Sequence, residues 1–318
     1  VLPYTAAHFA RAIVMPNLVP PVTDAASALA YRQRIKAAYS GDNFEPLMTA
    51  YLTDHSDPEG LVEAHQNGVI TAVKLYPAGA TTNADQGVTD VEKVFPVFEN
   101  MQDTDMPLLV HGEVVGPEHD IFDREKIFLD TILSAIHERF PNLKIVLEHV
   151  TTRQGIEFVA AASDKVAATI TPHHLMINRS TMFQGGIRPH LYCLPIAKRR
   201  EHQQALREAA TSGSAKYFLG TDSAPHAEHA KQSACGCAGI FNAGTAMACY
   251  AQVFEEENAL ENLEKFASIN GPNFYGLALN EDSLSLRRVN EPMDVPECVG
   301  QERVHQFLPD TPVYWRVI

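Results

Sequence analysis

The segment "ITAVKLYP", residues 70–77, places a charged side chain inside an apolar strand. Lys74 has apolar neighbours on both sides, and Pro77 and Gly79 end the run. Burying an ammonium group without a partner is costly. A lysine at the end of such a strand therefore needs either a partner or a chemical task.

Apolar runs of this kind recur along the chain and alternate with helix-like segments. The seven runs cover residues 11–17, 46–53, 70–77, 107–113, 144–150, 166–174 and 216–226. Amphipathic segments lie between them at residues 23–38 (with Thr23 or Asp24 as the cap), 88–102, 123–140 and 200–213. Regular alternation of strand and helix predicts parallel βαβ units.

Seven strands are compatible with two architectures. A (β/α)8 barrel has eight strands, so residues 11–226 form either an open doubly wound sheet or a barrel with one strand upstream of Val1. We expect a single domain over residues 1–318, with barrel units up to about residue 242 and C-terminal helices and a tail over residues 243–318. Residues 243–269 read as helices covering the barrel end, and residues 312–318 as a last strand.

The composition argues against several classes of partner. The 318 residues carry a net charge of −14, so we expect neither nucleic acid nor an anionic membrane as a partner. No apolar run approaches the ~18 residues of a membrane-spanning helix. The 14 histidines favour metal chemistry, and the five cysteines favour a reduced, cytoplasmic protein over a disulfide framework.

Polar residues stand at the C-terminal ends of five predicted strands: Asn17, Lys74, His111, His149 and Asp222. In a parallel barrel these ends open onto one face, where active sites are found. Imidazole nitrogens suit Zn²⁺, and Asp222 can supply an oxygen ligand. For Lys74 two interpretations stand side by side. Its amine adds carbon dioxide to form a carbamate that bridges two cations, or its side chain extends to solvent at the barrel mouth.

Eight motifs between about residues 3 and 278 resemble dihydroorotases of the shorter bacterial type, in the amidohydrolase superfamily. They are "VMPNLVPPV", "AVKLYPAGATTN", "LLVHGE", "LEHVTT", "ATITPHHLM", "GGIRPHLYCLP", "FLGTDSAPH" and "CGCAG", in that order. The resemblance implies a (β/α)8 TIM barrel of the metal-dependent hydrolase type with a binuclear zinc centre. It also implies the reversible hydrolysis of the cyclic amide of dihydroorotate to N-carbamoyl-aspartate, in pyrimidine biosynthesis. We further expect a homodimer.

The resemblance assigns roles to individual residues of the metal centre. It makes Lys74 the carboxylated lysine that bridges two Zn²⁺ ions. His111 and His149 resemble ligands of the second ion. Asp222 resembles a ligand of the first ion and the general acid/base.

The resemblance also implies how the substrate is held. Asn17 and His226 resemble the groups that bind the substrate carboxylate, and positive charge on His226 would help. The backbones of Leu194 and Ala238 resemble the contacts to the ring amide. Thr81 and Thr82 resemble the tip of a mobile loop that closes on the substrate. This loop, "PAGATTNADQG", has no evident apolar anchor in the sequence.

One part of the family pattern is absent from the sequence. The family carries a His-x-His pair at the end of its first strand, followed by an arginine for the substrate carboxylate, whereas no His-x-His occurs before His111. The sequence also predicts seven strands, one fewer than a (β/α)8 barrel has, which agrees with the absence of the first strand. We therefore expect an upstream first strand that supplies both, since residues 1–318 lack two ligands of the first ion.

Two other functions remain open beside dihydroorotase. A hydantoinase or allantoinase acts on a different cyclic amide, and "YCLP", "GTDSAPH" and the loop with Thr81 and Thr82 argue against it. A catalytically inactive, scaffold-like subunit would fit the missing His-x-His pair. The presence of Lys74, His111, His149 and Asp222 argues against that alternative.

Overall fold

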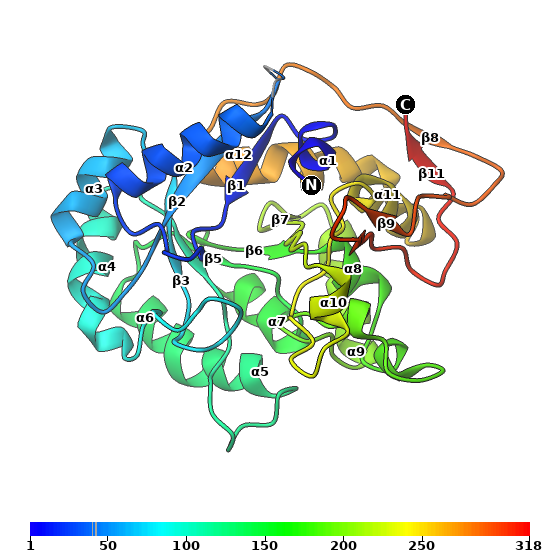
Figure 1. Ribbon diagram of the computed structural model, residues 1–318. Coiled ribbons are helices and arrows are strands. Elements are labelled where there is room, and N and C mark those ends of the chain that lie inside the picture. Colours follow the sequence, from blue (N-terminus) through cyan, green and yellow to red (C-terminus); the bar gives the residue numbers. More distant parts are fainter. Residues whose placement is uncertain (40, 42) are drawn as a thin grey trace.

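A parallel sheet of seven strands forms the centre of the computed structural model, which describes residues 1–318 apart from residues 40 and 42 (Figure 1). The strands lie in chain order, each hydrogen-bonded to the next, and the sheet curls like the wall of a barrel. They are β1 (Arg11–Val14), β2 (Glu45–Tyr51), β3 (Ala72–Leu75), β4 (Leu108–Val110), β5 (Ile145–Leu147), β6 (Val166–Ile170) and β7 (Tyr217–Leu219). All seven predicted strands are present, and the barrel-like α/β fold is confirmed.

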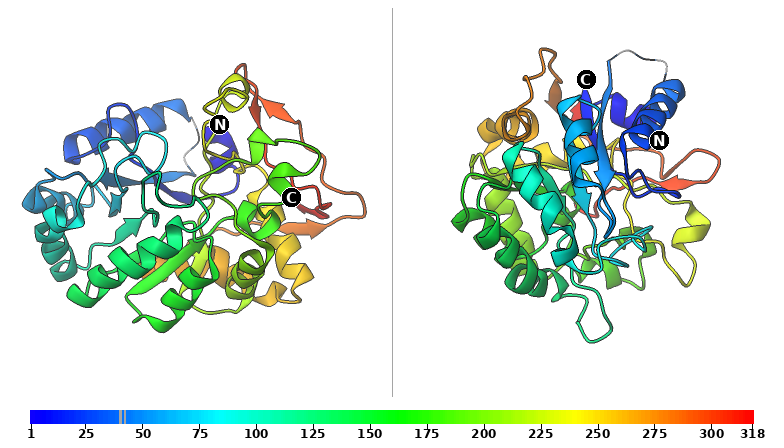
Figure 2. Two further views of the ribbon diagram at one scale, coloured as in Figure 1. Left: turned by 90° about the horizontal axis from the view of Figure 1, so that it is seen from below. Right: turned by 90° about the vertical axis from the view of Figure 1, so that its left-hand side faces the viewer.

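Helices on the outside of the sheet join these strands (Figure 2). They are α2 (Ala25–Ala38), α3 (Pro58–Gln66), α4 (Phe95–Asp103), α5 (Arg124–Phe128), the π-helical η2 (Leu129–Leu133), α6 (Ser134–Arg139), α7 (Arg153–Ala161) and α9 (Arg200–Thr211). Of the two predicted caps of α2, Asp24 is the one used, in a reciprocal box with Ser27. Such a cap contributes about 1 kcal/mol.

Side-chain alternation decides which residues enter the interior of the sheet. The inner apolar cluster takes one residue from each of five strands: Ala72, Leu109, Val146, Ala167 and Phe218. Their strand neighbour Val73 belongs instead to the core between the sheet and the helices. Successive side chains of a strand point to opposite faces, so residues two positions later again point inward. Two positions after Ala72, Leu109 and Val146 lie Lys74, His111 and Glu148.

The two ends of the sheet lie next to elements from opposite ends of the chain. Within the described residues, β1 and β7 are not hydrogen-bonded to each other. Helix α1 (Leu2–Ala6) places Tyr4 edge-on against Phe241, with 5.6 Å between the ring centroids. Helix α12 (Asn270–Tyr275) packs Phe274 and Tyr275 against the inner apolar cluster. Aromatic side chains of α1 and α12 therefore fill space beside the two ends of the sheet.

The C-terminal region adds helices and two small antiparallel sheets. Helices α11 (Ala246–Glu256), η5 (Leu260–Asn262) and η6 (Lys265–Ile269) lie where helices were predicted. Strand β8 (Leu286–Arg288) pairs with β11 (Trp315–Val317), which confirms the predicted last strand, and β9 (Cys298–Val299) pairs with β10 (Val304–His305). The remaining short elements are η1 (Val91–Val94), α8 (Pro172–Met176), η3 (Thr181–Phe183), η4 (Pro189–Leu191) and α10 (Glu228–Lys231). Among the described residues, no helix has the length and apolar character needed to cross a membrane.

Candidate metal centre

Lys74 lies inside the sheet with only 1% of its surface exposed. Its Nζ contacts carboxylate oxygen Oε2 of Glu148 and lies 5.0 Å from the centre of the Tyr76 ring. The interpretation in which Lys74 extends to solvent is therefore wrong. The ion pair with Glu148 is what allows this ammonium group to be buried in an apolar strand.

His111 and His149 lie side by side at the ends of β4 and β5, with 4.8 Å between their ring centroids. Nε2 of His111 is 2.8 Å from a carboxylate oxygen of Glu113. Nδ1 of His149 is buried and has no hydrogen-bond partner among the described residues. Burial lowers the pKa of His149 well below its usual range, and the nearby Lys74 adds to this effect. The ring is therefore a neutral imidazole, which is the form that binds metal ions.

Two predicted ligands have backbone conformations that are rare outside glycine. His149 has φ of 42° and Asp222 has φ of 43°. Such conformations cost energy and occur preferentially at functional sites. At His149, the backbone N–H donates to Oγ1 of Thr169 at 2.7 Å, which fixes the turn. Because of this turn, the His149 side chain does not take the direction that the alternation of side chains along β5 would give it.

Asp222 is surrounded by the other charged groups of the interior. Burial raises the pKa of Asp222 to about 6. The nearby Lys74 and His111 act to lower this pKa, and Glu148 acts to raise it. A carboxyl group with this pKa can accept and release a proton near neutral pH.

The donor set fits divalent cations of the zinc type. It consists of the imidazoles of His111 and His149, the carboxylate of Asp222 and the amine of Lys74. Nδ1 of His149 has no hydrogen-bond partner among the described residues. In the described part of the chain, the ligand atoms of His111, His149 and Asp222 do not form a single group within 4.8 Å. Ligands of two ions ~3.5–4 Å apart need not converge on one point. The spacing is thus compatible with His111 and His149 on one ion and Asp222 on another.

Asn17 connects the end of β1 to the loop that carries Thr81 and Thr82. Its Nδ2 donates to the Thr82 carbonyl at 3.0 Å, and its Oδ1 accepts from the Tyr76 hydroxyl at 3.1 Å. The Asn83 side chain donates in turn to the Asn17 carbonyl at 3.0 Å. The structure therefore brings three of the predicted substrate-binding residues together.

The same loop is anchored by small apolar side chains, contrary to the prediction from the sequence. Ala80, Ala84 and Val88 are 1%, 0% and 4% exposed. Ala84 packs with Tyr51 and Tyr76 in a small separate cluster. Alanine carries little hydrophobic signal in a sequence, which is why these anchors were not recognised.

Lys231 joins the two segments that carry Leu194 and Ala238. Its ammonium group donates to the carbonyls of Tyr192, Cys237 and Gly239 at 2.7, 2.8 and 2.9 Å. The residue is 3% exposed, and its three N–H groups match three acceptors. The structure thus brings the predicted ring-amide contacts together through a buried lysine.

His226 lies beside Ala238 but does not carry the expected positive charge. Its Nε2 donates to the Ala238 carbonyl at 3.0 Å. Burial lowers the pKa of His226, so the ring is mostly neutral at pH 7. Any contact with a substrate carboxylate is therefore a hydrogen bond rather than an ion pair.

Comparison with known proteins places this arrangement in a family. The model of the amidohydrolase family matches residues 2–281. A dihydroorotase from Pectobacterium atrosepticum is 58% identical over 320 residues, which cover 100% of this chain and 92% of the relative. The chain belongs to the dihydroorotases of the amidohydrolase family.

Solved structures of dihydroorotases have the same fold. The Campylobacter jejuni enzyme matches with a TM-score of 0.89 and 37% identity, covering 99% of this chain and 90% of that one. The Saccharomyces cerevisiae enzyme in complex with 5-fluoroorotic acid matches with a TM-score of 0.86 and 32% identity, covering 100% and 92%. An L-hydantoinase from Arthrobacter aurescens is 16% identical at a TM-score of 0.82, which shows a shared fold alone.

Sequence reasoning missed three polar residues of this dihydroorotase site. Glu148 follows Val146 by two positions, so strand alternation would have indicated its inward direction. Glu113 follows His111 by two positions within the quoted "LLVHGE". Lys231 ends the four-residue helix α10, which is too short for a periodic pattern, so nothing in the sequence distinguishes it from an exposed lysine.

Proposed function

We propose that the chain hydrolyses the cyclic amide of dihydroorotate to N-carbamoyl-aspartate, reversibly and with zinc, in pyrimidine biosynthesis. The observation that carries this proposal is that Lys74, His111 and Asp222 stand at the ends of strands of one parallel sheet and act on each other electrostatically, with the pKa of Asp222 raised to about 6. The 58% identity to a dihydroorotase supports the same substrate.

Two Zn²⁺ ions per subunit are proposed as cofactors. A carboxylated Lys74 would hold both, His111 and His149 would hold one, and Asp222 the other. When bound, such ions supply Lewis acidity toward the amide carbonyl and make water a stronger nucleophile. Neutral His149 with its free Nδ1 is ready to act as a ligand. Glu113 can orient the His111 ring through its 2.8 Å contact.

Asp222 is proposed to carry the proton between the two halves of the reaction. An amide has a poor leaving group, so the ring nitrogen must be protonated as its bond to the carbonyl carbon breaks. Asp222 accepts a proton from the attacking water and gives a proton to the departing nitrogen. In the ring-closing direction the same carboxyl group takes the proton back from that nitrogen.

The substrate is proposed to lie between the Asn17 side and the Lys231 side of the barrel mouth. Asn17 would donate a hydrogen bond to the substrate carboxylate, and neutral His226 would do so by redirecting its single N–H from the Ala238 carbonyl to that carboxylate. The backbones of Leu194 and Ala238 would contact the ring amide, held in place by Lys231. Thr81 and Thr82 would cover the substrate and exclude water.

The decisive experiment is a turnover panel that contains dihydroorotate, a hydantoin, allantoin and dihydrouracil. We expect strong preference for dihydroorotate. Asp222→Asn should lower turnover by about 10²–10⁴-fold while the fold is kept. Asp282→Asn, at an exposed position, serves as the control and should be unchanged. Preference for a hydantoin would replace the proposed substrate, and an active Asp222→Asn variant would remove the proton-carrier role.

We also propose a cytoplasmic homodimer. In the part of the chain that the structure describes, all five cysteines are free thiols, which suits a reducing compartment. Sedimentation of the purified protein tests the dimer, and cell fractionation tests the location.

A further inference from the structure

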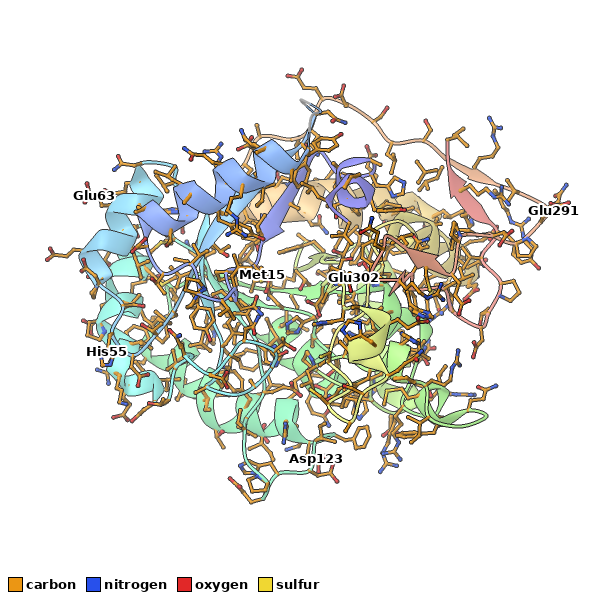
Figure 3. The ribbon with its side chains drawn as sticks, in the orientation of Figure 1. Met15, His55, Glu63, Asp123, Glu291 and Glu302 are labelled. Atoms are coloured by element: carbon orange, nitrogen blue, oxygen red, sulfur yellow. The ribbon has the colours of Figure 1, made fainter. Side chains whose placement is uncertain are left out.

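Three side chains of metal-ligand type meet where the β9–β10 hairpin lies against α10. They are Glu228, Cys298 and His305, whose candidate ligand atoms all lie within 4.8 Å of one another. Cys298 and His305 are directly opposite each other on the two strands, so both side chains leave the hairpin on the same face. Glu228 opens α10, and its backbone N–H donates to the carbonyl of Glu302, which Figure 3 labels at this place.

We propose that Glu228, Cys298 and His305 form a second metal site, for a thiophilic divalent cation of the zinc class, outside the catalytic centre. One thiolate, one imidazole and one carboxylate are a ligand set that Zn²⁺ accepts, with water in the fourth position. The proposal does not depend on the reaction that the chain catalyses.

The present hydrogen bond between His305 and Glu228 is close to the geometry that a cation needs. Nε2 of His305 lies 2.8 Å from Oε1 of Glu228. Two such ligand atoms on one tetrahedral Zn²⁺ lie about 3.3 Å apart, so a cation in place of the shared proton requires roughly 0.5 Å of opening. The other oxygen of Glu228, Oε2, stays bonded to Nε of Arg303 at 2.7 Å. Nη2 of Arg303 also donates to Oε1 at 3.3 Å, so a cation at Oε1 replaces this longer bond while the bond to Oε2 is kept.

The ring of His305 is already held in a ligand-like orientation. His190 stacks on it with 3.5 Å between the centroids and 19° between the planes. The other ring nitrogen, Nδ1, lies 3.6 Å from a carboxylate oxygen of Glu297. Metal-binding histidines usually direct their second nitrogen to a carboxylate, and Glu297 stands on that side of the ring. Nε2 now carries the proton that it donates to Glu228, so binding a cation there releases this proton. Gln232 fixes His190 in turn through a 3.1 Å hydrogen bond.

The charges of the cluster balance once a cation is bound. The Arg303 guanidinium lowers the pKa of Glu228 to about 2, so this carboxylate is ionised near neutral pH. Glu228, Glu297 and a Cys298 thiolate together carry three negative charges. A divalent cation and Arg303 carry three positive charges. Binding therefore removes local charge imbalance instead of adding to it.

A second cluster of the same kind, His173, His174 and Cys193, is less suited to a metal. Both ring nitrogens of His174 already form hydrogen bonds, to Thr171 and to the Pro195 carbonyl. Nδ1 of His173 is bonded to Asn242, whereas its buried Nε2 has no hydrogen-bond partner among the described residues. Burial raises the pKa of both the Cys193 thiol and the Cys298 thiol, so it is the hydrogen bonds of His174 that distinguish the two clusters.

The proposed site would connect the C-terminal hairpin to a segment next to the substrate. Helix α10 begins two residues after His226 and ends before Ala238. A cation that binds both the hairpin and α10 would reduce the motion of this segment. Its effect on catalysis would appear in KM more than in kcat.

The test is a titration of the full-length, catalytically loaded protein with Co²⁺ alone. Cobalt bound to a thiolate absorbs in the near ultraviolet, and none of the proposed catalytic ligands is a cysteine. We expect one additional equivalent with this absorption, and its loss in both Cys298→Ser and His305→Gln. Cys235→Ser, at an exposed thiol of the same region, is the matched control and should keep it.

Each other outcome overturns the proposal. An absorption that survives in Cys298→Ser, or disappears in Cys235→Ser, places the metal on a different thiol. Loss in Cys298→Ser with retention in His305→Gln means a single-thiol adduct rather than a three-ligand site. Absence of an additional equivalent in the parent protein removes the site. Circular dichroism and the unchanged turnover of each variant show that folding is not the cause.

Discussion

The ammonium group of Lys74 in β3 and the carboxylate of Glu148, directly after β5, form a buried ion pair between residues 74 positions apart in the sequence. Removing one partner of such a pair leaves an uncompensated charge, which costs about 3–5 kcal/mol. We expect Lys74→Met and Glu148→Gln each to lower the free energy of unfolding of metal-free protein by this amount. The double variant should lose clearly less than the sum, as measured by urea unfolding in a double-mutant cycle. Strict additivity would show that the two side chains do not stabilise each other.

The same lysine should control metal content. Lys74→Ala is expected to lose at least one metal equivalent and most of its turnover, because the amine that would form the bridging carbamate is removed. Metal analysis after gel filtration measures the first effect and the dihydroorotate assay the second. Full metal loading with near-normal turnover would contradict the carboxylated-lysine assignment.

Replacing both Thr81 and Thr82 by alanine should impair catalysis and leave metal content unchanged. The two hydroxyls are expected to act on the substrate, whereas the loop itself is anchored through Ala84 and Asn17. Asn17→Ala should in addition increase cleavage within residues 77–88 during limited proteolysis, since it removes the bond to the Thr82 carbonyl. If kcat and KM of the double threonine variant equal those of the parent, the loop has no role in closure.

Lys231→Met should weaken substrate binding without affecting the metals. It removes three hydrogen bonds and leaves the Cys237 and Gly239 carbonyls without a protein donor, at about 1–3 kcal/mol for each unsatisfied group, whereas the Tyr192 carbonyl still accepts from the Gly239 N–H. We expect KM to rise by about tenfold or more, because the Leu194 and Ala238 segments lose their common support. Lys265→Met, at an exposed lysine, is the control. An unchanged KM would limit Lys231 to a role in stability.

His174 should make stability depend on pH below neutrality. Burial lowers the pKa of His174 to about 3, whereas the unfolded chain protonates it near 6.5. The unfolded state therefore binds more protons between these values, and the stability contributed by the neutral ring is lost as pH falls below 6.5. For one such histidine the loss between pH 7 and pH 5 is about 2 kcal/mol. His174→Gln should show a shallower pH dependence by that amount in metal-stripped protein, and an identical dependence would refute the assignment.

The strands were predictable because they are apolar, regular and followed by polar residues. Lys74, His111 and Asp222 stand out in the sequence for the same reason, since each interrupts or ends an apolar run. Interaction partners that lie far away in the sequence produce no such local pattern. Glu148 and Lys231 become important only through contacts with residues 74 and 39 positions away. The neutral state of His226 likewise depends on burial, which its local sequence does not reveal.

The proposed ligands of the metal centre lie in β3 and directly after β4, β5 and β7, so the first 222 of the 318 residues must be synthesised before they can meet. A nascent chain that ends before Tyr217 already contains His111 and His149 but has no Asp222. Each neighbouring pair of strands is also separated by a helix or long connection, which makes the contacts non-local and the folding slow. Binding of metal to the full set of proposed ligands would therefore show that the sheet is complete. A folding intermediate would bind the cation only through an incomplete set of ligands.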